Sequence, residues 1–172
     1  RGVWITAADE KVRIAEKERK RVFGRGFKCE VSVEPGLSER IDALMERAAL
    51  SALSISRKAG ELVTGFSKVE IALRRGSVVG LIHASDASED GIRKLAAVAA
   101  SRNETANGPQ VVRLFDSTQL DLALGRSNVI HAALLAGQAS ENFLSRVREL
   151  EVFRSNSATN DIGNAAGAVA QD

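Results

Sequence analysis

The segment from Thr64 to Lys68 has the residue types of an anion-binding turn at the start of a helix. Gly65 lets a ligand approach the backbone, and the free N–H groups of a first helical turn carry partial positive charge. Ser67 adds a hydroxyl donor and Lys68 adds an ammonium group. The pattern predicts a site that attracts phosphate, and the alternative is a turn that only caps the helix.

A second polar turn lies downstream, where Gly125-Arg126-Ser127-Asn128 separates an apolar helical pattern from an apolar run. Arg126 is suited to contact a phosphate or to stack on an exposed base. The alternative is an arginine that is simply solvated on a loop. Arg126 and Ser127 are therefore the second pair of candidates for binding a polyanion.

Basic residues are distributed unevenly along the 172-residue chain, although its formal net charge is only +2. Residues 1–28 contain nine basic and four acidic residues, and residues 51–102 contain eight basic and five acidic residues. Such concentrations favour a polyanionic partner, because local fields act over about 10 Å. Ordinary solvated faces are the alternative. Further candidate phosphate contacts in these blocks are Arg19, Lys20, Arg21, Arg25, Arg57 and Lys58.

The residue pattern gives little support for a catalytic site, a metal site or a disulfide. The acidic run from Ser85 to Asp90 is typical of a helix cap and first turn rather than of a metal site. His83 and His131 lie in apolar runs, and we expect hydrogen-bonded core or sheet-face residues rather than a base or a ligand. Cys29 is the single cysteine, which excludes an internal disulfide and a cysteine metal cage. We therefore expect no enzyme, no metal and no cofactor.

Apolar runs in the chain are far shorter than the roughly 20 residues of a membrane span, and no charged-then-apolar leader opens the chain. Because a lone cysteine also suits a reducing compartment, we expect a cytoplasmic protein without a membrane partner. The chain starts at Arg1 rather than at Met, so we expect a fragment that lacks upstream residues.

Alternating helices and strands must position the two polar turns. Apolar residues at a 3.6-residue spacing predict helices, and apolar runs between turn residues predict strands. The predicted strands are 62–63, 78–84, 111–115 and 129–135. The first two predicted helices are 10–22 and 38–58, the second with Ser38 as its cap. The third ends at Gly76 and has Phe66, Val69, Ala72 and Leu73 on one face. Three more helices follow: one capped by Ser88 or Asp86, one capped by Asp116 or Ser117, and one that starts after Gly137.

This order of elements predicts an α/β fold, namely a three-layer α/β/α sandwich with a four-stranded mixed sheet. We expect this domain at residues 37–154, with a helical linker at 37–52. Residues 1–36 form a separate basic segment in this prediction, with a break at Gly24-Arg25-Gly26. Residues 155–172 offer little apolar surface, so a disordered tail is expected there.

Three motifs carry a resemblance to a known family: KAG-x-LV-x-G from Lys58 to Gly65, ASDAS from Ala84 to Ser88, and Leu-x-x-x-Leu-Gly ending at Gly125. Over roughly residues 50–153 the chain resembles the L-seven-Ae and L-thirty-e family of ribosomal and kink-turn RNA-binding proteins, especially its bacterial YlxQ-like branch. The resemblance implies the same sandwich. It also implies that the two polar turns contact RNA.

The turn that follows Thr64 departs from the family pattern, which is Gly-Ala-Asn-Glu and whose Asn and Glu contact sheared G·A pairs. The matching residues here are Gly65, Phe66, Ser67 and Lys68. Without the amide and the carboxylate, the resemblance implies attraction to phosphate rather than specific kink-turn readout.

The first residues of the chain carry a second resemblance. Arg1-Gly2-Val3-Trp4 and the basic pattern after it resemble the second half of the YlxR family, which are small bacterial proteins thought to bind RNA. The resemblance implies that residues 1–36 are a small partial α+β YlxR-like segment whose first half is absent.

We therefore expect a non-catalytic protein that binds structured RNA in bacterial transcription or translation, mainly through phosphate contacts. Ribosomal RNA, the RNA of a processing enzyme and nascent transcripts are the candidate ligands, with the ribosome or the transcription machinery as candidate assemblies. One alternative is a protein-interaction adaptor in transcription termination or antitermination. Another is the substrate-binding part of an RNA-modifying enzyme.

Overall fold

The computed structural model describes residues 4–18, 20–28, 32, 34–101 and 108–165. The chain divides into two compact units. The smaller unit comprises Arg1–Glu46 and Arg148–Asp172, and the larger unit comprises Arg47–Val147. The larger unit contains both polar turns.

The larger unit is built on a four-stranded mixed sheet, as predicted. Its strands are β1 (Leu62–Thr64), β2 (Val78–His83), β3 (Gln110–Val112) and β4 (His131–Leu135). Their order is β1-β4-β2-β3, with β4 antiparallel to β1 and β2, and β3 parallel to β2. β4 begins at His131 rather than at Val129, because the N–H of Val129 donates to the Asp121 carboxylate instead of to the sheet.

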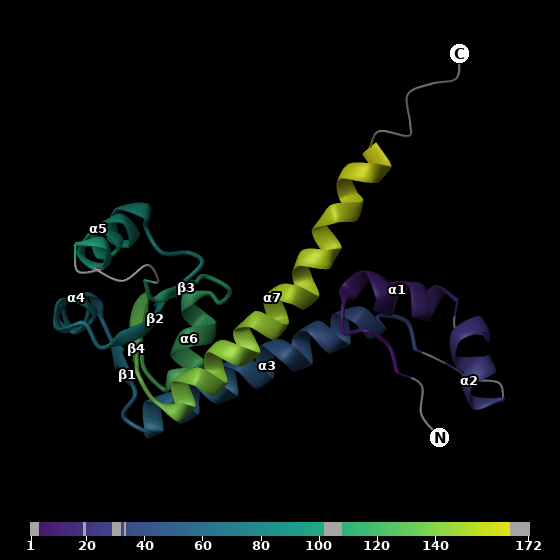
Figure 1. Cartoon of the computed structure of the whole chain (residues 1–172), viewed down its shortest axis with the longest axis horizontal. Helices are drawn as coiled ribbons and strands as arrows, with labels where there is room; N and C mark the ends of the chain where they lie inside the picture. Colours follow the sequence, from purple (N-terminus) through teal and green to yellow (C-terminus); the bar gives the residue numbers. More distant parts are fainter. Residues whose placement is uncertain (1–3, 19, 29–31, 33, 102–107, 166–172) are drawn as a thin grey trace, which may run out of the picture. The chain divides into compact units, whose positions relative to one another are not determined.

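Helices cover both faces of this sheet, which confirms the predicted three-layer α/β/α sandwich (Figure 1). On one face lie α4 (Phe66–Arg75) and α5 (Glu89–Ala100). The other face is covered by α6 (Ser117–Leu124) and by the parts of α3 (Leu37–Lys58) and α7 (Gln138–Ala165) that belong to the larger unit. The helical linker predicted at 37–52 is part of α3.

Helix ends in the larger unit follow the predicted signals. α3 and α4 end before Gly60 and Gly76, whose φ angles are +75° and +78°. Of the predicted alternatives, Ser88 caps α5, and Asp116 caps α6 in a reciprocal capping box with the helix. Local sequence therefore determines these boundaries.

A hydrophobic core fills the space between the sheet and the α4/α5 layer. Its buried members are Val69, Leu73, Leu81, Leu95 and Ala133. On the opposite face, the ring centroids of Phe115 and Phe143 lie 6.3 Å apart, and both side chains are fully buried. The sheet is thus covered on both sides, as its apolar strands require.

In the smaller unit, most of the residues described between 9 and 27 are helical. It contains α1 (Asp9–Lys17), the π-helical turn η1 (Lys20–Gly24) and α2 (Arg25–Phe27). The predicted helix 10–22 is wrong in its second part, because α1 ends at Lys17, and the predicted break at Gly24-Arg25-Gly26 is helical. No strand occurs among the described residues from 4 to 36, so the expected α+β character is not found there; residues 1–3 lie outside the described part.

Ser38 does not cap α3, contrary to the prediction. The helix starts at Leu37, and the fully buried Ser38 donates its hydroxyl hydrogen to the carboxylate of Asp9 instead. In the same unit, Arg154 forms an ion pair with Asp42 at 2.7 Å. These polar contacts connect α1 with α3 and α3 with α7 inside the smaller unit.

α7 continues to Ala165, so residues 155–165, for which we expected disorder, are part of this helix, whereas 166–172 lie outside the described residues. In the part of the chain that the structure describes, we find no helix with both the length and the apolar character needed to span a bilayer.

Truncation of Leu95 tests the α4/α5 core. Leu95 is fully buried, so Leu95→Ala is expected to lower the free energy of unfolding by about 2–5 kcal/mol in urea titrations, through lost burial and the cavity left behind. Leu122→Ala is the matched control, because Leu122 is 85% exposed, and it should change stability by less than about 0.5 kcal/mol. Equal effects of the two truncations on stability would show that Leu95 is not part of a buried core.

Candidate functional site

The N-terminus of α4 has the geometry predicted for an anion-binding turn. Gly65 precedes the helix with φ +95°, a conformation that a residue with a side chain rarely adopts. Its own N–H donates to the carbonyl of His131 at 2.9 Å, which fixes the start of α4 to the end of β4. No side chain caps the helix among the described residues, and Ser67 and Lys68 are exposed. The first N–H groups of α4 are therefore open to a ligand.

A pocket of about 520 Å³ adjoins this helix start. Three segments of the larger unit meet around it: the start of α4, the start of α5 and the loop before β4. The lining residues are Gly65, Phe66, Ser88, Asp90, Gly91, Lys94, Asn128, Ile130 and His131. The pocket thus brings together the two polar turns that lie apart in the sequence.

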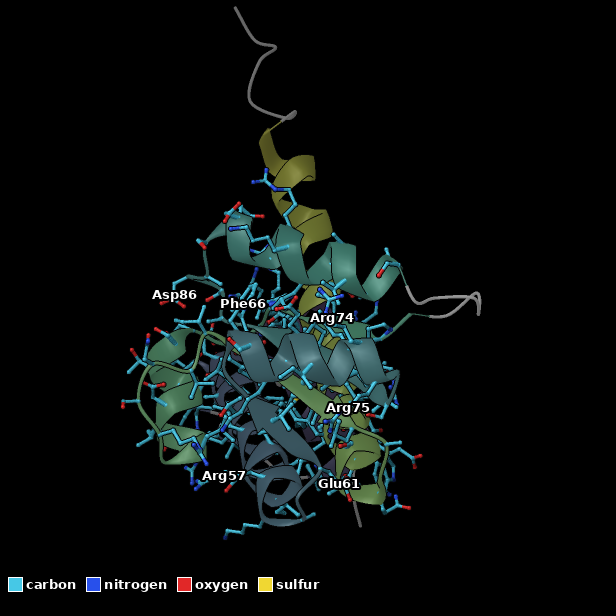
Figure 2. The ribbon with its side chains drawn as sticks, turned by 90° about the vertical axis from the view of Figure 1, so that its left-hand side faces the viewer. Arg57, Glu61, Phe66, Arg74, Arg75 and Asp86 are labelled. Carbon is cyan, nitrogen blue, oxygen red and sulfur yellow. The ribbon has the colours of Figure 1, made fainter. Side chains whose placement is uncertain are left out.

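Phe66 is a functional candidate that the sequence pattern placed on the buried face of its helix. Val69, Ala72 and Leu73 of that face are buried as predicted, but Phe66 is 36% exposed and lines the pocket. Figure 2 shows Phe66 at the start of α4, with Arg74 and Arg75 at the opposite end of the helix. An aromatic ring is therefore accessible beside the open N–H groups.

His83 and His131 form a buried pair at the end of the sheet next to the pocket. They face each other across the antiparallel register of β2 and β4, and their Nδ1 atoms are 2.9 Å apart. Each is less than a tenth exposed, as expected for sheet-face residues. The ring of His131 also meets Phe66 edge-on, with the centroids 5.9 Å apart.

Burial keeps both imidazoles neutral at pH 7. Desolvation, then the neighbouring His131 and Arg113, lowers the pKa of His83 to about 4. Desolvation also lowers the pKa of His131. A neutral pair with one hydrogen bond between its Nδ1 atoms leaves the Nε2 atom of each ring for other contacts.

Gly91 allows α5 to pass close to this pair. A Cβ atom at position 91 would lie 2.8 Å from Nε2 of His131, closer than a side-chain carbon can approach. Because Gly91 has no side chain, the His131 ring has room to lie at the pocket.

The loop before β4 has a fixed backbone. The Asp121 carboxylate accepts the N–H of Asn128 at 2.8 Å and that of Val129 at 2.7 Å. Gly125 and Asn128 both have positive φ, +53° and +62°. Arg126 and Ser127 are exposed on this loop, as expected for a contact site. The candidates at the second turn therefore project from a well-defined loop.

Asp121 was missed as a site residue, although the sequence contains a signal for it. A carboxylate in the last turn of a helix is disfavoured by the helix dipole. An acidic residue four positions before Gly125 is therefore a candidate acceptor for nearby N–H groups, which here belong to the loop backbone.

The remaining predicted cations have other surroundings. Arg57 donates from its guanidinium to the carbonyl oxygen of Leu124, so it stabilises the end of α6, and Lys58 is exposed. In the smaller unit, Arg21 pairs with Glu18 at 2.6 Å and Arg25 is exposed. Arg19 and the Lys20 side chain lie outside the described part.

The acidic run from Ser85 to Asp90 serves helix starts, as the sequence indicated. The Asp86 carboxylate accepts the N–H and the hydroxyl of Ser117, which lowers the pKa of Asp86. Asp90 pairs with Arg93 and Lys94. Among the described residues, no group of three or more His, Cys, Asp or Glu side chains could hold a metal ion.

Comparison with known proteins gives a likeness of fold. No family model matches the chain, and no curated protein is significantly similar to it in sequence. A protein of unknown function from Bacillus halodurans is 23% identical with a TM-score of 0.51, and the match covers 58% of this chain and 96% of that one. A 15.5 kD RNA-binding protein from Giardia lamblia is 16% identical with a TM-score of 0.47, over 65% of this chain and 89% of that one.

At these identities the likeness concerns the fold alone. No match supports the expected relation of residues 1–36 to the YlxR family.

Acid should destabilise the fold through the histidine pair. His83 has a lowered pKa in the folded state, so the unfolded chain binds more protons between pH 6.5 and about 4. The contribution of His83 to the free energy of unfolding is then fully present above pH 6.5, and it is lost as the pH falls through this window. In urea titrations, the free energy of unfolding should fall from pH 7.5 to pH 5 by about 1–2 kcal/mol more in the unmodified protein than in His83→Asn. An equal loss in both would show that the pair is not the cause.

Removal of the Asp121 carboxylate should loosen the loop before β4. Asp121→Ala leaves the N–H groups of Asn128 and Val129 without their acceptor, which should cost about 1–3 kcal/mol in urea titrations. Amide hydrogen exchange at these two residues should accelerate. Unchanged exchange would mean that other contacts hold the loop.

Proposed function

We propose that the chain binds structured RNA at the edge of the sandwich where the pocket opens. The supporting observation is that the pocket is lined by Gly65 and Phe66 from one polar turn and by Asn128 from the other. Two segments that each suit a polyanion therefore form one continuous surface. The proposal is one of binding without catalysis, metal or cofactor.

Phosphate contacts supply the affinity in this proposal. The start of α4 offers backbone N–H groups without a side-chain cap, and such groups favour an anion. Lys68 and Arg126 are exposed and have no ion-pair partner among the described residues, whereas Arg74 and Arg93 are paired with carboxylates. The two unpaired cations are thus available to phosphate oxygens.

The pocket supplies selectivity for RNA that has an unpaired nucleotide. Its volume is within the range of small-ligand sites. Phe66 presents part of an aromatic ring, and Gly65 and Gly91 leave room for a flat group to approach the backbone. Single-stranded bases are commonly recognised by such stacking together with a few polar contacts. Structured RNA with an unstacked base is therefore the preferred ligand class.

The resemblances in the sequence give the biological setting of the proposal. A YlxQ-like domain whose turn has Ser67 and Lys68 in place of Asn and Glu would favour backbone contacts over G·A readout. Arg25 and the neighbouring cations of the smaller unit would add phosphate contacts of low specificity. Ribosomal, processing-enzyme and nascent RNAs of bacterial transcription and translation are the ligands to test.

Charge reversal at the proposed surface tests the function. Lys68→Glu and Arg126→Glu should each weaken binding of a labelled structured RNA by about tenfold or more in fluorescence anisotropy, because each replaces a phosphate contact with repulsion. Arg75→Glu is the matched control, since it makes the same charge change at the opposite end of α4 (Figure 2).

Salt dependence gives a second readout from the same assay. Affinity of the unmodified protein should fall steeply with salt, and the slope should be smaller for both reversed variants. Equal losses in all three variants, or a flat salt response, would contradict a site at the pocket edge. A protein partner retained after nuclease treatment, without RNA binding, would favour the adaptor alternative.

A further inference from the structure

The neutral pair of His83 and His131 holds its two rings in opposite tautomers. Their Nδ1 atoms are 2.9 Å apart, so a hydrogen bond between them needs one proton, carried by one of the two rings. If His83 donates this proton, His131 carries its own hydrogen on Nε2. If His131 donates, its Nε2 is a bare acceptor. The two rings are therefore coupled.

The Nε2 edge of His131 is placed to act on a ligand. His131 lines the pocket and is 6% exposed, and its Nε2 has no hydrogen-bond partner among the described residues. Gly91, beside Nε2, also lines the pocket. A ring nitrogen at the wall of a pocket can donate or accept a hydrogen bond from a ligand or water. The atom thus marks a specific polar contact inside the pocket.

We propose that His83, which does not line the pocket, sets the hydrogen-bonding character of His131 Nε2 toward bound RNA, and that an RNA oxygen accepting from Nε2 favours the singly protonated form of the pair. The proposal rests on the proposed RNA binding and assigns a specificity role within that site. His83 acts as a positioning residue and His131 as the contact.

The neutral pair donates from His131 Nε2 only while His83 holds the hydrogen between the Nδ1 atoms, whereas the singly protonated pair donates in either case and as a cation. A singly protonated pair keeps one hydrogen between the Nδ1 atoms and has a hydrogen on both Nε2 atoms, so His131 can only donate to the pocket. A carbonyl or phosphate oxygen of RNA stabilises this state, because the contact becomes charge-assisted. By linkage, affinity for such a group rises as the pH falls, at most about tenfold per pH unit for one proton.

The charged groups near the pair are paired with one another. Arg113 and Glu89 face His83 and pair with each other at 2.9 Å. On the pocket side, Asp90 is held by Lys94 and Arg93, and these contacts lower its pKa. The chain contains only two histidines, so a proton taken up between pH 5.5 and 7.5 can be traced to this pair.

The test measures RNA affinity against pH at constant ionic strength. The probe is the structured RNA that the unmodified full chain binds at pH 7.5, and thermal unfolding confirms that each variant is folded at each pH. Affinity of the unmodified protein should rise about three- to tenfold from pH 7.5 to 5.5, within the one-proton limit. His83→Asn should abolish this rise, because an amide can pair with Nδ1 of His131 but cannot share the charge.

Two further variants separate the proposed contact from a general charge effect. His131→Asn removes the Nε2 donor while His83 still titrates, so it should weaken binding and lose the rise. Lys68→Gln should weaken binding at every pH and keep the rise. A rise that persists in either histidine variant would overturn the proposal, as would a flat pH profile of the unmodified protein. A flat profile with intact, salt-sensitive RNA binding would leave the proposed function standing, whereas the lack of any RNA binding would reject both.

Discussion

The antiparallel pairing of β2 with β4 is the constraint on which the geometry of the larger unit depends. Its register places His83 opposite His131 and Leu81 opposite Ala133, so one pairing positions both the buried histidines and the core under α4 and α5. The carbonyl of His131 then receives the N–H of Gly65, which determines where α4 begins. Because the Asp121-bound loop leads directly into β4, the second polar turn is held at the same edge.

Several basic residues of the larger unit are paired with carboxylates. Arg74, Arg93 and Arg113 are each neutralised by a carboxylate nearby. Surface pairs of this kind add little stability, but they reduce attraction to a polyanion. Lys68 and Arg126 lack such a partner among the described residues, which supports the proposed phosphate contacts at the pocket edge although the net charge of the chain is small.

Local signals made much of the larger unit predictable from the sequence. Gly76, Ser88 and Asp116 mark helix ends through backbone conformation or capping, and these effects act over a few residues. The apolar strands then required helices on both faces, which gave the sandwich. The positions of Gly65 and Arg126 on exposed turns followed from the same reasoning.

Other features depend on tertiary structure and could not be predicted. The contact between His83 and His131 needs the strand register, and the exposure of Phe66 needs the pocket formed with α5. The hydrogen bond from the Arg57 guanidinium to the Leu124 carbonyl at the end of α6 also needs the tertiary fold, and the contact of Arg57 with phosphate stays a prediction. In the smaller unit, Gly24 and Gly26 predicted a break, yet both are helical.

Mapping the bound RNA onto individual amides tests the central claim most directly. In NMR titrations of the isotope-labelled protein with structured RNA, the largest chemical-shift changes should fall on residues 65–68, on Gly91 and on 126–131, and the Arg75 end of α4 should be unaffected. Changes concentrated at the Arg75 end, with none at residues 65–68, would contradict it.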